Sequence, residues 1–497
     1  MSPTISRREF LRLAALSPLI ASPPVRSSLQ TASSKQNVLF LVFDTLSARH
    51  ISLYGYARDT MPNLTHFAAK ATVFHNHYSA GSFTSPSTGS LLTGVYPSTH
   101  RAFQAIATTI PQFRDSNFFS LFQQAGYHTL SFSQNLLVNV LVDDFLKWVV
   151  QYVPADAFAL ASKEFSDDVF RRDYGIAVQA ERSYLSPLGG YSNSLFLSLL
   201  SQFFGRRTLN SIPSEIRQAF PRGLPQNHDL YYLLEDLMDW AIGYIPSMPQ
   251  PYAAYLHIMP PHDPYNPRQD FIGAFADQPA LVPEKPSHFF SDGRAQAFLD
   301  EKREEYDEYI AYVDAEFGRL VNSLDQQGAL ENTWVVFTSD HGELFERGIY
   351  RHITPVLYES LIRVPLLIRA PGQLARQDVQ SLTSSIDILP TLIDQLKIQD
   401  QTSREGRVLP PWLAPDSNRT VFAVEAKSNA KRGPINHGTI AALQSGKKLV
   451  HYFGYGGYES EHEFYDLEND PEELANRYDP LDPDVQKLSK KIETMRR

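Results

Sequence analysis

Two continuous apolar runs, each followed by an aspartate, constrain the fold of this chain most strongly. Residues 38–43 read VLFLVF and stop at Asp44, and residues 334–338 read WVVFT and stop one residue before Asp340. A short continuous apolar run is typical of a strand that is buried on both faces of a sheet. We therefore expect two buried strands, each ending at an acidic side chain.

The same alternation extends along much of the chain. Two more apolar runs and three segments of helical periodicity follow: residues 252–258 and 364–368, and residues 61–69, 304–327 and 385–395. Strands that alternate with helices predict an α/β fold with an open, mostly parallel sheet flanked by helices. Such sheets bind ligands at the carboxyl ends of their strands. Asp44 and Asp340 would both lie there, so the sequence predicts that they share a site.

The composition excludes several classes of function. The formal net charge is −10 and no basic stripe offsets it, so we expect no nucleic-acid partner. The chain has no cysteine, which excludes disulfides, thiolate metal sites and a cysteine nucleophile. An anionic ligand would therefore need local positive charge, from a metal ion or from a few basic side chains.

The first residues resemble a twin-arginine export signal. Arg7 and Arg8 precede a modest apolar run at residues 13–21, which is shorter than the roughly 20 residues that span a bilayer. The alternative is the charged start of a helix. We expect the twin-arginine machinery to export the chain to the periplasm, the cell envelope or the medium, with no transmembrane domain in the mature chain.

Three parts follow from these patterns. We expect a signal and linker at residues 1–36 and a catalytic domain at 37–410. A small α+β subdomain with antiparallel strands would occupy residues 411–497. Irregular apolar stretches predict a largely helical insertion at about residues 136–226. Within it, the apolar segment 194–205 is interpreted as a contact with the core, or alternatively with a lipid-like substrate.

The segment FTSPSTGSLLTG at residues 83–94 carries the most specific motif. Pro86 suits the first turn of a helix, Ser85 is expected to cap it and Gly94 to end it. Thr84 would then stand at a helix N-terminus, where free N–H groups and the helix dipole favour phosphate or sulfate. A hydroxyl there becomes a nucleophile once a metal lowers its pKa, whereas the alternative is an ordinary capped helix.

This segment resembles the sulfatase signature, in which Cys-x-Pro-x-Arg precedes Leu-Leu-Thr-Gly. Aligned on Pro86, Thr84 stands at the cysteine position and Thr88 at the arginine position. Other blocks similar to the sulfatase family of the alkaline phosphatase superfamily follow in order: residues 44–64, 261–265, 338–343, 358–365, 386–392 and 465–471. The resemblance covers about residues 37–135 and 250–476, and it implies an alkaline-phosphatase-like fold.

The resemblance also implies a metal site. Asp44, Asp340 and His341 would bind the metal, and Thr84 would be both a ligand and the nucleophile. Carboxylates and imidazole suit a divalent cation. Thr45 replaces the second acid of the family's usual Asp-Asp pair, which weakens the case for Ca²⁺. His341 adds weight toward Mn²⁺ or Zn²⁺, with Ca²⁺ or Mg²⁺ compatible.

Two histidines complete the implied site. His262 and His352 would bind the ester oxygens or protonate the leaving group, since the pKa of histidine lies near neutrality. For each of them the alternative is a structural role. Lys447 and Lys448 are interpreted as solvated lysines of a hairpin, although either would be a possible cation for the substrate.

Thr84 also departs from the family pattern. Sulfatases make formylglycine from cysteine or, in some bacteria, from serine, whereas oxidation of a threonine hydroxyl gives a ketone. The arginine used in maturation is also replaced, by Thr88. We therefore expect no formylglycine. Because threonine is the nucleophile of related phosphodiesterases, the resemblance favours hydrolysis of a phosphodiester or a phosphonate, in a small-molecule or a glycan- or lipid-linked anionic ester. The alternatives are a sulfuric ester hydrolase without formylglycine and a catalytically silent anion-binding protein.

Overall fold

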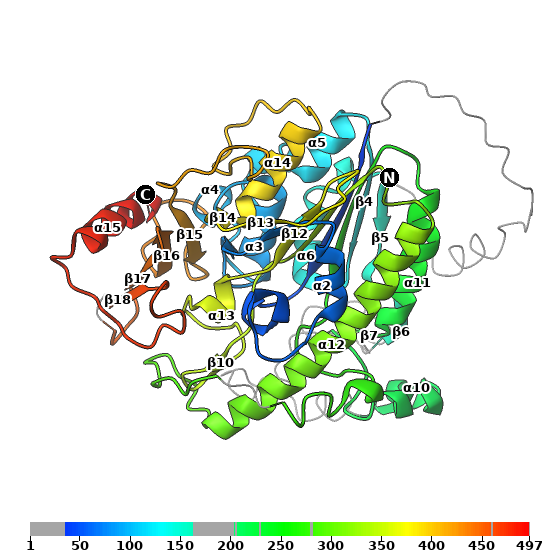
Figure 1. The fold of residues 1–497 in the computed structure, drawn as a ribbon, viewed down its shortest axis with the longest axis horizontal. Helices are drawn as coiled ribbons and strands as arrows, with labels where there is room; N and C mark the ends of the chain where they lie inside the picture. Colours follow the sequence, from blue (N-terminus) through cyan, green and yellow to red (C-terminus); the bar gives the residue numbers. More distant parts are fainter. Residues whose placement is uncertain are drawn as a thin grey trace, which may run out of the picture. The chain divides into compact units, whose positions relative to one another are not determined.

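A mostly parallel sheet forms the centre of the described part of the chain (Figure 1). In spatial order its eight strands are β13 (Gln377–Val379), β2 (Thr72–Phe74), β12 (Leu366–Arg369), β9 (Thr333–Ser339), β1 (Asn37–Phe43), β8 (Tyr252–Ile258), β4 (His128–Ser133) and β5 (Gln151–Val153). Of these, β12 runs antiparallel to both of its neighbours, and every other pairing in the sheet is parallel. The predicted open α/β sheet is confirmed.

The computed structural model describes residues 35–162, 203, 206–227, 230–278, 282–458 and 461–496. Residues 36–497 form one unit and residues 1–35 another. The predicted twin-arginine segment lies outside the described residues, and so does nearly all of segment 194–205. None of the described helices combines the length and the apolar character needed to cross a bilayer. The domain boundaries proposed from the sequence stay predictions.

Alternate side chains of β1 belong to two separate cores, because successive side chains of a strand point to opposite faces. Leu39, Leu41 and Phe43 pack on one face and Val38 and Phe40 on the other, all of them fully buried. Helices α2 (Pro62–Ala68), α11 (Leu234–Tyr244) and α12 (Gln296–Gln326) cover the first face; α3 (Thr84–Thr93), α5 (Phe118–Gln124), α6 (Leu136–Asp143) and α14 (Ile388–Gln395) cover the second. The molecule is thus layered as helix, sheet and helix, which explains why β1 reads as an unbroken apolar run.

Shorter elements connect these layers. They are the helices α4 (Pro97–His100), α10 (Ser214–Ala219) and α13 (Glu359–Ile362), and three two-stranded ladders, formed by β3 (His77–Tyr78) with β14 (Thr383–Ser384), β6 (Ala159–Ser162) with β7 (Leu230–Tyr232), and β10 (Phe345–Glu346) with β11 (Ile349–Tyr350). The β10–β11 hairpin lies a few residues after the end of β9, on the chain segment that also carries Asp340.

A second sheet closes the C-terminal part. Its antiparallel strands are β15 (Val421–Glu425), β16 (Gly438–Gln444), β17 (Lys447–Phe453) and β18 (His462–Asp466), followed by α15 (Pro483–Arg496). One face packs on α15 through Val485, Leu488 and Ile492. The other face packs on Tyr358 and Leu361, in and beside α13. The small sheet therefore supports the segment that follows the site described below.

Candidate metal and nucleophile site

Four neighbouring parallel strands deliver polar side chains to one edge of the central sheet. Asp44 follows β1, Asp340 follows β9, Asn135 comes shortly after β4, and His257 is the penultimate residue of β8. All four side chains are buried. Parallel strands end at the same edge, so residues that are almost 300 positions apart in sequence meet there. The predicted meeting of Asp44 with Asp340 is confirmed.

One carboxylate oxygen of Asp44 is saturated and the other has no partner. Oδ2 accepts hydrogen bonds from Asn135 Nδ2 at 2.5 Å and from His257 Nε2 at 3.2 Å. The Tyr255 hydroxyl lies 3.0 Å from His257 Nδ1, which places the imidazole hydrogen on Nε2 when Tyr255 donates. Oδ1 is buried and without a hydrogen-bond partner.

Asp340 has the same division between its two oxygens. Oδ1 accepts the backbone N–H groups of His341 at 2.9 Å and of Thr45 at 3.2 Å, while Oδ2 is buried without a hydrogen-bond partner. Thr45 adopts a φ of 62°, a conformation that β-branched residues rarely take. Such backbone strain clusters at functional sites, and here it occurs at the residue whose N–H bonds Asp340.

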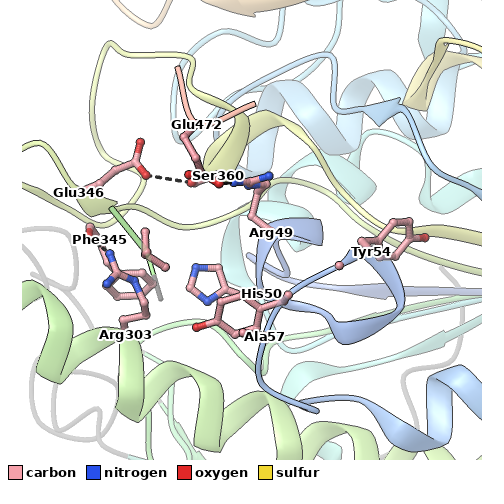
Figure 2. Close-up of a pocket in the computed structure, with 12 residues that line it drawn as sticks. Arg49, His50, Tyr54, Ala57, Arg303, Phe345, Glu346, Ser360 and Glu472 are labelled. Atoms are coloured by element: carbon pink, nitrogen blue, oxygen red, sulfur yellow. Dashed lines mark hydrogen bonds and ion pairs between the residues drawn. The ribbon is translucent and has the colours of Figure 1, made fainter. Parts of the chain in front are cut away.

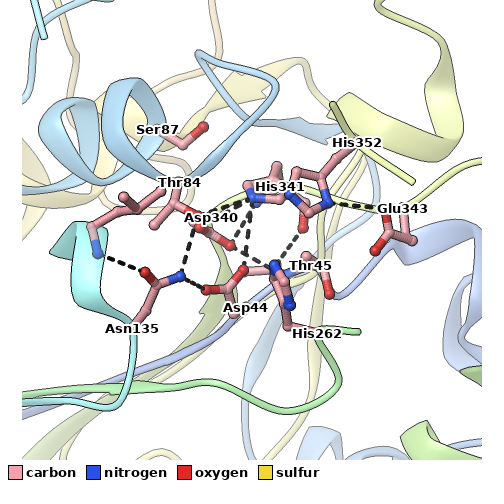
Figure 3. A network of polar contacts seen from close by, with 12 residues as sticks. Asp44, Thr45, Thr84, Ser87, Asn135, His262, Asp340, His341, Glu343 and His352 are labelled. Carbon is pink, nitrogen blue, oxygen red and sulfur yellow. Dashed lines mark hydrogen bonds and ion pairs between the residues drawn. The ribbon is translucent and has the colours of Figure 1, made fainter. Parts of the chain in front are cut away.

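His341 directs a lone pair toward both free oxygens. Its Nδ1 donates to the carbonyl of Gly342 at 2.9 Å, so Nε2 carries the lone pair. Nε2 lies 3.7 Å from Asp44 Oδ1 and 3.5 Å from Asp340 Oδ2 (Figure 3). One ligand atom from each of the three residues lies within 4.8 Å of the others. Unpartnered carboxylate oxygens beside a free imidazole nitrogen fit a divalent cation, which these three residues would hold.

The pKa values of the two aspartates are shifted in opposite directions. Burial alone would raise the pKa of Asp44, but the hydrogen bond from His257 and the neighbouring imidazoles lower it below its ordinary value. Burial and the adjacent charge of Asp44 raise the pKa of Asp340. Two fully buried carboxylates in contact repel each other, and no lysine or arginine among the described residues forms an ion pair with either. A bound cation would relieve that repulsion.

Thr84 is the first residue of α3 and faces this cluster. Its Oγ1 lies 3.5 Å from His341 Nε2 and 3.4 Å from Asn135 Nδ2, and the residue is 2% exposed. Gly94 ends the helix with a φ of 67°, as predicted. The capping prediction for Ser85 is wrong: the helix starts at Thr84 with Phe83 as its N-cap, two residues earlier than predicted, and the Ser85 hydroxyl donates instead to the carbonyl of Ala105.

His262 and His352 lie beside the cluster, with their ring centroids 5.1 Å apart. The His352 ring is also 4.6 Å from the His341 ring. Nδ1 of each ring forms a hydrogen bond. His262 Nδ1 bonds the carbonyl of Asp263 at 2.7 Å, and His352 Nδ1 bonds Glu343 Oε1 at 3.0 Å. The Nε2 atom of each ring is therefore the one left for a substrate. His262 is half-buried and His352 buried.

Glu343 fixes the orientation of the His352 ring. Its other oxygen accepts the Tyr265 hydroxyl at 3.1 Å, so the carboxylate is held on both sides. Burial raises the pKa of Glu343 to about 7, although nearby imidazoles work against the shift. Burial and the neighbouring imidazoles lower the pKa of His352 well below its ordinary value. Both shifts favour the uncharged forms of the two side chains, and the hydrogen bond to Glu343 orients the His352 ring.

Sequence reasoning missed three residues of the site: Asn135, His257 and Glu343. His257 stands near the carboxyl end of a predicted strand, whereas Asn135 follows β4, a strand that the sequence did not predict. His257 was hidden inside an apolar run, and Asn135 stood just before the predicted insertion of residues 136–226 with no role assigned. Glu343 follows the Asp340-His341 pair after Gly342 and belongs to the same block, which was its available signal.

A separate cavity of about 150 Å³ lies beyond the loop that follows Asp44 (Figure 2). Arg49 and Glu472 form an ion pair on its wall, and Lys285 pairs with Glu346 at 2.8 Å and with Glu472 at 3.2 Å. Because these charges are largely paired with one another, the cavity is not a second anion site. Arg49 therefore has a structural role in this network, which its sequence context did not indicate.

Lys448 is not the solvated lysine that the sequence predicted. It is fully buried, and its Nζ lies 2.7 Å from Glu473 Oε1 and 3.3 Å from Glu359 Oε1. Lys447, the neighbouring residue, keeps 29% of its side chain exposed and pairs with Asp466. Period-two alternation along β17 places the two lysines on opposite faces of the small sheet.

Fold and site together define an α/β protein with a buried group of two acids and a histidine that suits a metal ion, and with a hydroxyl as candidate nucleophile. The sulfatase family model matches residues 36–398, and a model described as N-sulphoglucosamine sulphohydrolase, C-terminal, matches residues 348–497. The chain belongs to the sulfatase family of the alkaline phosphatase superfamily, and it is a sulfatase-family ester hydrolase.

Proteins named for different activities are similar to most of this chain. The chain is 24% identical over 468 residues to a choline-sulfatase of Rhizobium meliloti, covering 89% of this chain and 82% of the relative. It is 24% identical over 512 residues to an N-acetylglucosamine-6-O-sulfatase of Bacteroides thetaiotaomicron, covering 94% and 86%. The crystal structure of a phosphonate monoester hydrolase of Agrobacterium radiobacter superposes with a TM-score of 0.66 at 20% identity, covering 93% of this chain and 95% of that one.

Proposed function

We propose that this protein is a metal-dependent hydrolase of phosphodiesters or phosphonate monoesters and that Thr84 is its nucleophile. The observation that carries the proposal is the position of Thr84 Oγ1, at the N-terminus of α3 and 3.5 Å from His341 Nε2. Threonine cannot mature to formylglycine, so the chemistry at this position rests on its own hydroxyl. The similarity in fold to a solved phosphonate monoester hydrolase supports the choice of a phosphorus ester.

The N-terminus of α3 would bind the anionic group. The first N–H groups of a helix have no partner inside the helix, and the positive end of its dipole attracts an anion. Pro86 lacks an N–H, so Thr84 and Ser85 supply the first donors. The phosphorus atom would then lie next to Thr84 Oγ1.

The reaction would proceed in two displacements. Thr84 Oγ1, with its proton already lost to solvent, attacks phosphorus; a Thr–O–P bond forms and the bond to the leaving oxygen breaks, leaving the electron pair on that oxygen. Water then attacks the same phosphorus, and Thr84 leaves as the alkoxide. A divalent cation held by Asp44, Asp340 and His341 would favour the deprotonated hydroxyl and offset the charge on the ester oxygens.

His262 and His352 are assigned to proton transfer and to contact with the ester oxygens. Because Nδ1 of each ring is bound to a fixed oxygen, exchange with the substrate is confined to Nε2. One ring gives a proton to the leaving oxygen in the first step and takes one from water in the second, so the protons balance over the cycle. We favour His262 for this role, because it is the more exposed of the two.

Sulfate ester hydrolysis through the unmodified Thr84 is the second candidate. The observation that favours it is the similarity to a choline-sulfatase and to a sugar 6-O-sulfatase along most of the chain. The same two-step scheme would apply, with sulfur in place of phosphorus. We favour Mn²⁺ or Zn²⁺ for the metal, since His341 joins two carboxylates in the ligand set.

One comparison tests the proposal. Wild type, Thr84→Ala and Thr84→Ser would be assayed with an aryl phosphodiester, an aryl phosphonate monoester and an aryl sulfate, and their bound metal measured. We expect a phosphorus ester to be the best substrate, and Thr84→Ala to lose roughly 10³-fold or more in kcat while it retains metal. Sulfate turnover well above that of both phosphorus esters would reverse the substrate assignment. Full activity of Thr84→Ala would refute the nucleophile.

A further inference from the structure

Asn135 joins the predicted nucleophile to a predicted metal ligand. Its Nδ2 donates to Asp44 Oδ2 at 2.5 Å and to Thr84 Oγ1 at 3.4 Å. An amide NH₂ carries two hydrogens, so both bonds form at once. Asp44 comes from the end of β1 and Thr84 from the start of α3, and Figure 3 shows the Asn135 amide between them. Asn135 is 5% exposed, so water competes little for these bonds.

The fold fixes the orientation of this amide. Asn135 is the N-cap residue of α6, and its Oδ1 accepts the backbone N–H of Leu137 at 2.8 Å. A backbone N–H has to face an oxygen, so the NH₂ end is forced toward Asp44 and Thr84. The backbone of Asn135 is held as well, because its N–H donates to Ser133 Oγ at 3.0 Å.

Capping alone does not require asparagine. Aspartate and serine cap helices about as well, because the cap uses only a side-chain oxygen. Among these residues, asparagine alone offers an acceptor for the helix and, at the same time, a neutral pair of donors on the other side. The choice of residue is therefore explained by the site and not by the helix.

We propose that Asn135 is the positioning residue of Thr84. Its hydrogen bond occupies one lone pair of Oγ1 and selects one of the side-chain rotamers that threonine otherwise shares. The same NH₂ holds Asp44 Oδ2, so Asp44 Oδ1 stays turned toward the metal cluster. Once Oγ1 is ionised, the bond to it becomes charge-assisted and stronger, which favours the reactive form. This inference rests on the proposed role of Thr84 as the nucleophile.

The test uses two substitutions that keep a capping oxygen, remove the amide donor and add no charge beside Asp44, Asn135→Ser and Asn135→Thr. With the best phosphorus ester from the substrate comparison, we expect each to lower kcat by about 10- to 100-fold, the loss of one charge-assisted hydrogen bond. KM, bound metal and the thermal unfolding midpoint should stay close to wild type. The matched control is Asn139→Ser, one turn further along α6, where Nδ2 donates only to the carbonyl of Ser133; its kcat should not change.

Each outcome bears on the proposal. A fall in kcat with metal and KM retained supports it, and Asn135→Ser or Asn135→Thr at wild-type kcat overturns it. A fall in kcat that merely follows loss of metal or of folding in both variants also overturns it, since the role would then be structural. Failure of the proposed function looks different: wild type would not turn over phosphorus esters, or Thr84→Ala would remain active, whatever Asn135 does.

Discussion

Asp44 and Asp340 follow adjacent parallel strands, and each keeps one carboxylate oxygen saturated by two donors and the other free of any hydrogen-bond partner. The free oxygens lie on the same side, next to His341 Nε2. Such an arrangement destabilises the protein without a cation, because both carboxylates are fully buried.

Asp340→Asn should therefore stabilise the protein in a chelator. The amide oxygen still accepts the N–H groups of Thr45 and His341, whereas the like charge beside Asp44 is removed. We expect its thermal midpoint to exceed that of wild type in EDTA, and added Mn²⁺ or Zn²⁺ to raise the midpoint of wild type but not of the variant. Differential scanning fluorimetry across a metal titration measures both. A lower midpoint for Asp340→Asn in EDTA would show that the two charges do not oppose folding.

Gly342→Ala should disrupt the metal cluster. A Cβ at this residue would lie 2.1 Å from the carbonyl oxygen of Ser360, which is backbone and cannot swing aside. The displaced segment carries His341, so we expect bound metal and activity to fall together. Gly243→Ala is the matched control: it lies inside α11 with nothing within 4 Å of the new methyl group. That substitution should stabilise the protein by about 0.5–1 kcal/mol with activity unchanged.

His100 makes stability depend on pH. It is buried against α3, with Nδ1 accepting the N–H of Ala102 and Nε2 donating to the carbonyl of Pro86, both at 3.1 Å. This neutral form has no place for a second proton, and burial lowers the pKa of His100 to about 3 from an ordinary value of 6.5. Above pH 6.5 the ring is neutral in both the folded and the unfolded protein, so its full contribution to the free energy of unfolding is present there. That contribution is lost as the pH falls from 6.5 toward 3, because the unfolded chain then binds a proton that the folded protein excludes.

Urea unfolding at two pH values measures this effect. Between pH 7 and pH 5, His100 should contribute a loss of about 2 kcal/mol in unfolding free energy, at 1.4 kcal/mol for each pH unit below its ordinary pKa. His100→Gln should be less stable at pH 7 and should show a correspondingly flatter dependence. An identical pH slope for the two proteins would contradict the assignment of a neutral ring.

Lys448 should be important for folding, in contrast to its neighbour. Lys448→Met would leave Glu359 and Glu473 buried together without their cation, at a cost of about 3–5 kcal/mol. Lys447→Met removes a partly exposed pair with Asp466 and should cost less than about 1 kcal/mol. Chemical denaturation of the two variants provides the comparison, and equal losses would count against the buried triad.

Much of the fold was predictable from local pattern. The apolar runs that became β1, β8 and β9 were visible because a strand buried on both faces has no polar positions to interrupt it. The antiparallel direction of β12 was not predictable, since a short run carries no sign of its direction. The strand β15 was not predicted either: it has only five residues, and it is fixed by antiparallel pairing with the next strand, β16.

The candidate site was predicted where an acid or a motif stood out. Asp44, Asp340, His341 and Thr84 stood at strand ends or in blocks with a family resemblance, and the structure brings them together. His257 and Asn135 were missed because a single histidine in an apolar strand and a single asparagine at a helix start each have an ordinary structural explanation. Their hydrogen bonds in the structure, and not their sequence contexts, show that both side chains hold Asp44 Oδ2 in place.

Trapping the covalent intermediate tests the central claim, that Thr84 is the nucleophile, most directly. Wild-type enzyme with bound metal would be mixed with an aryl phosphodiester or phosphonate, quenched in acid during turnover, digested and analysed by mass spectrometry. Our account predicts a phosphorus ester on the hydroxyl of Thr84, absent from Thr84→Ala and accumulating at the rate of the first displacement. Steady turnover with Thr84 unmodified, or with the ester on another residue, would contradict it.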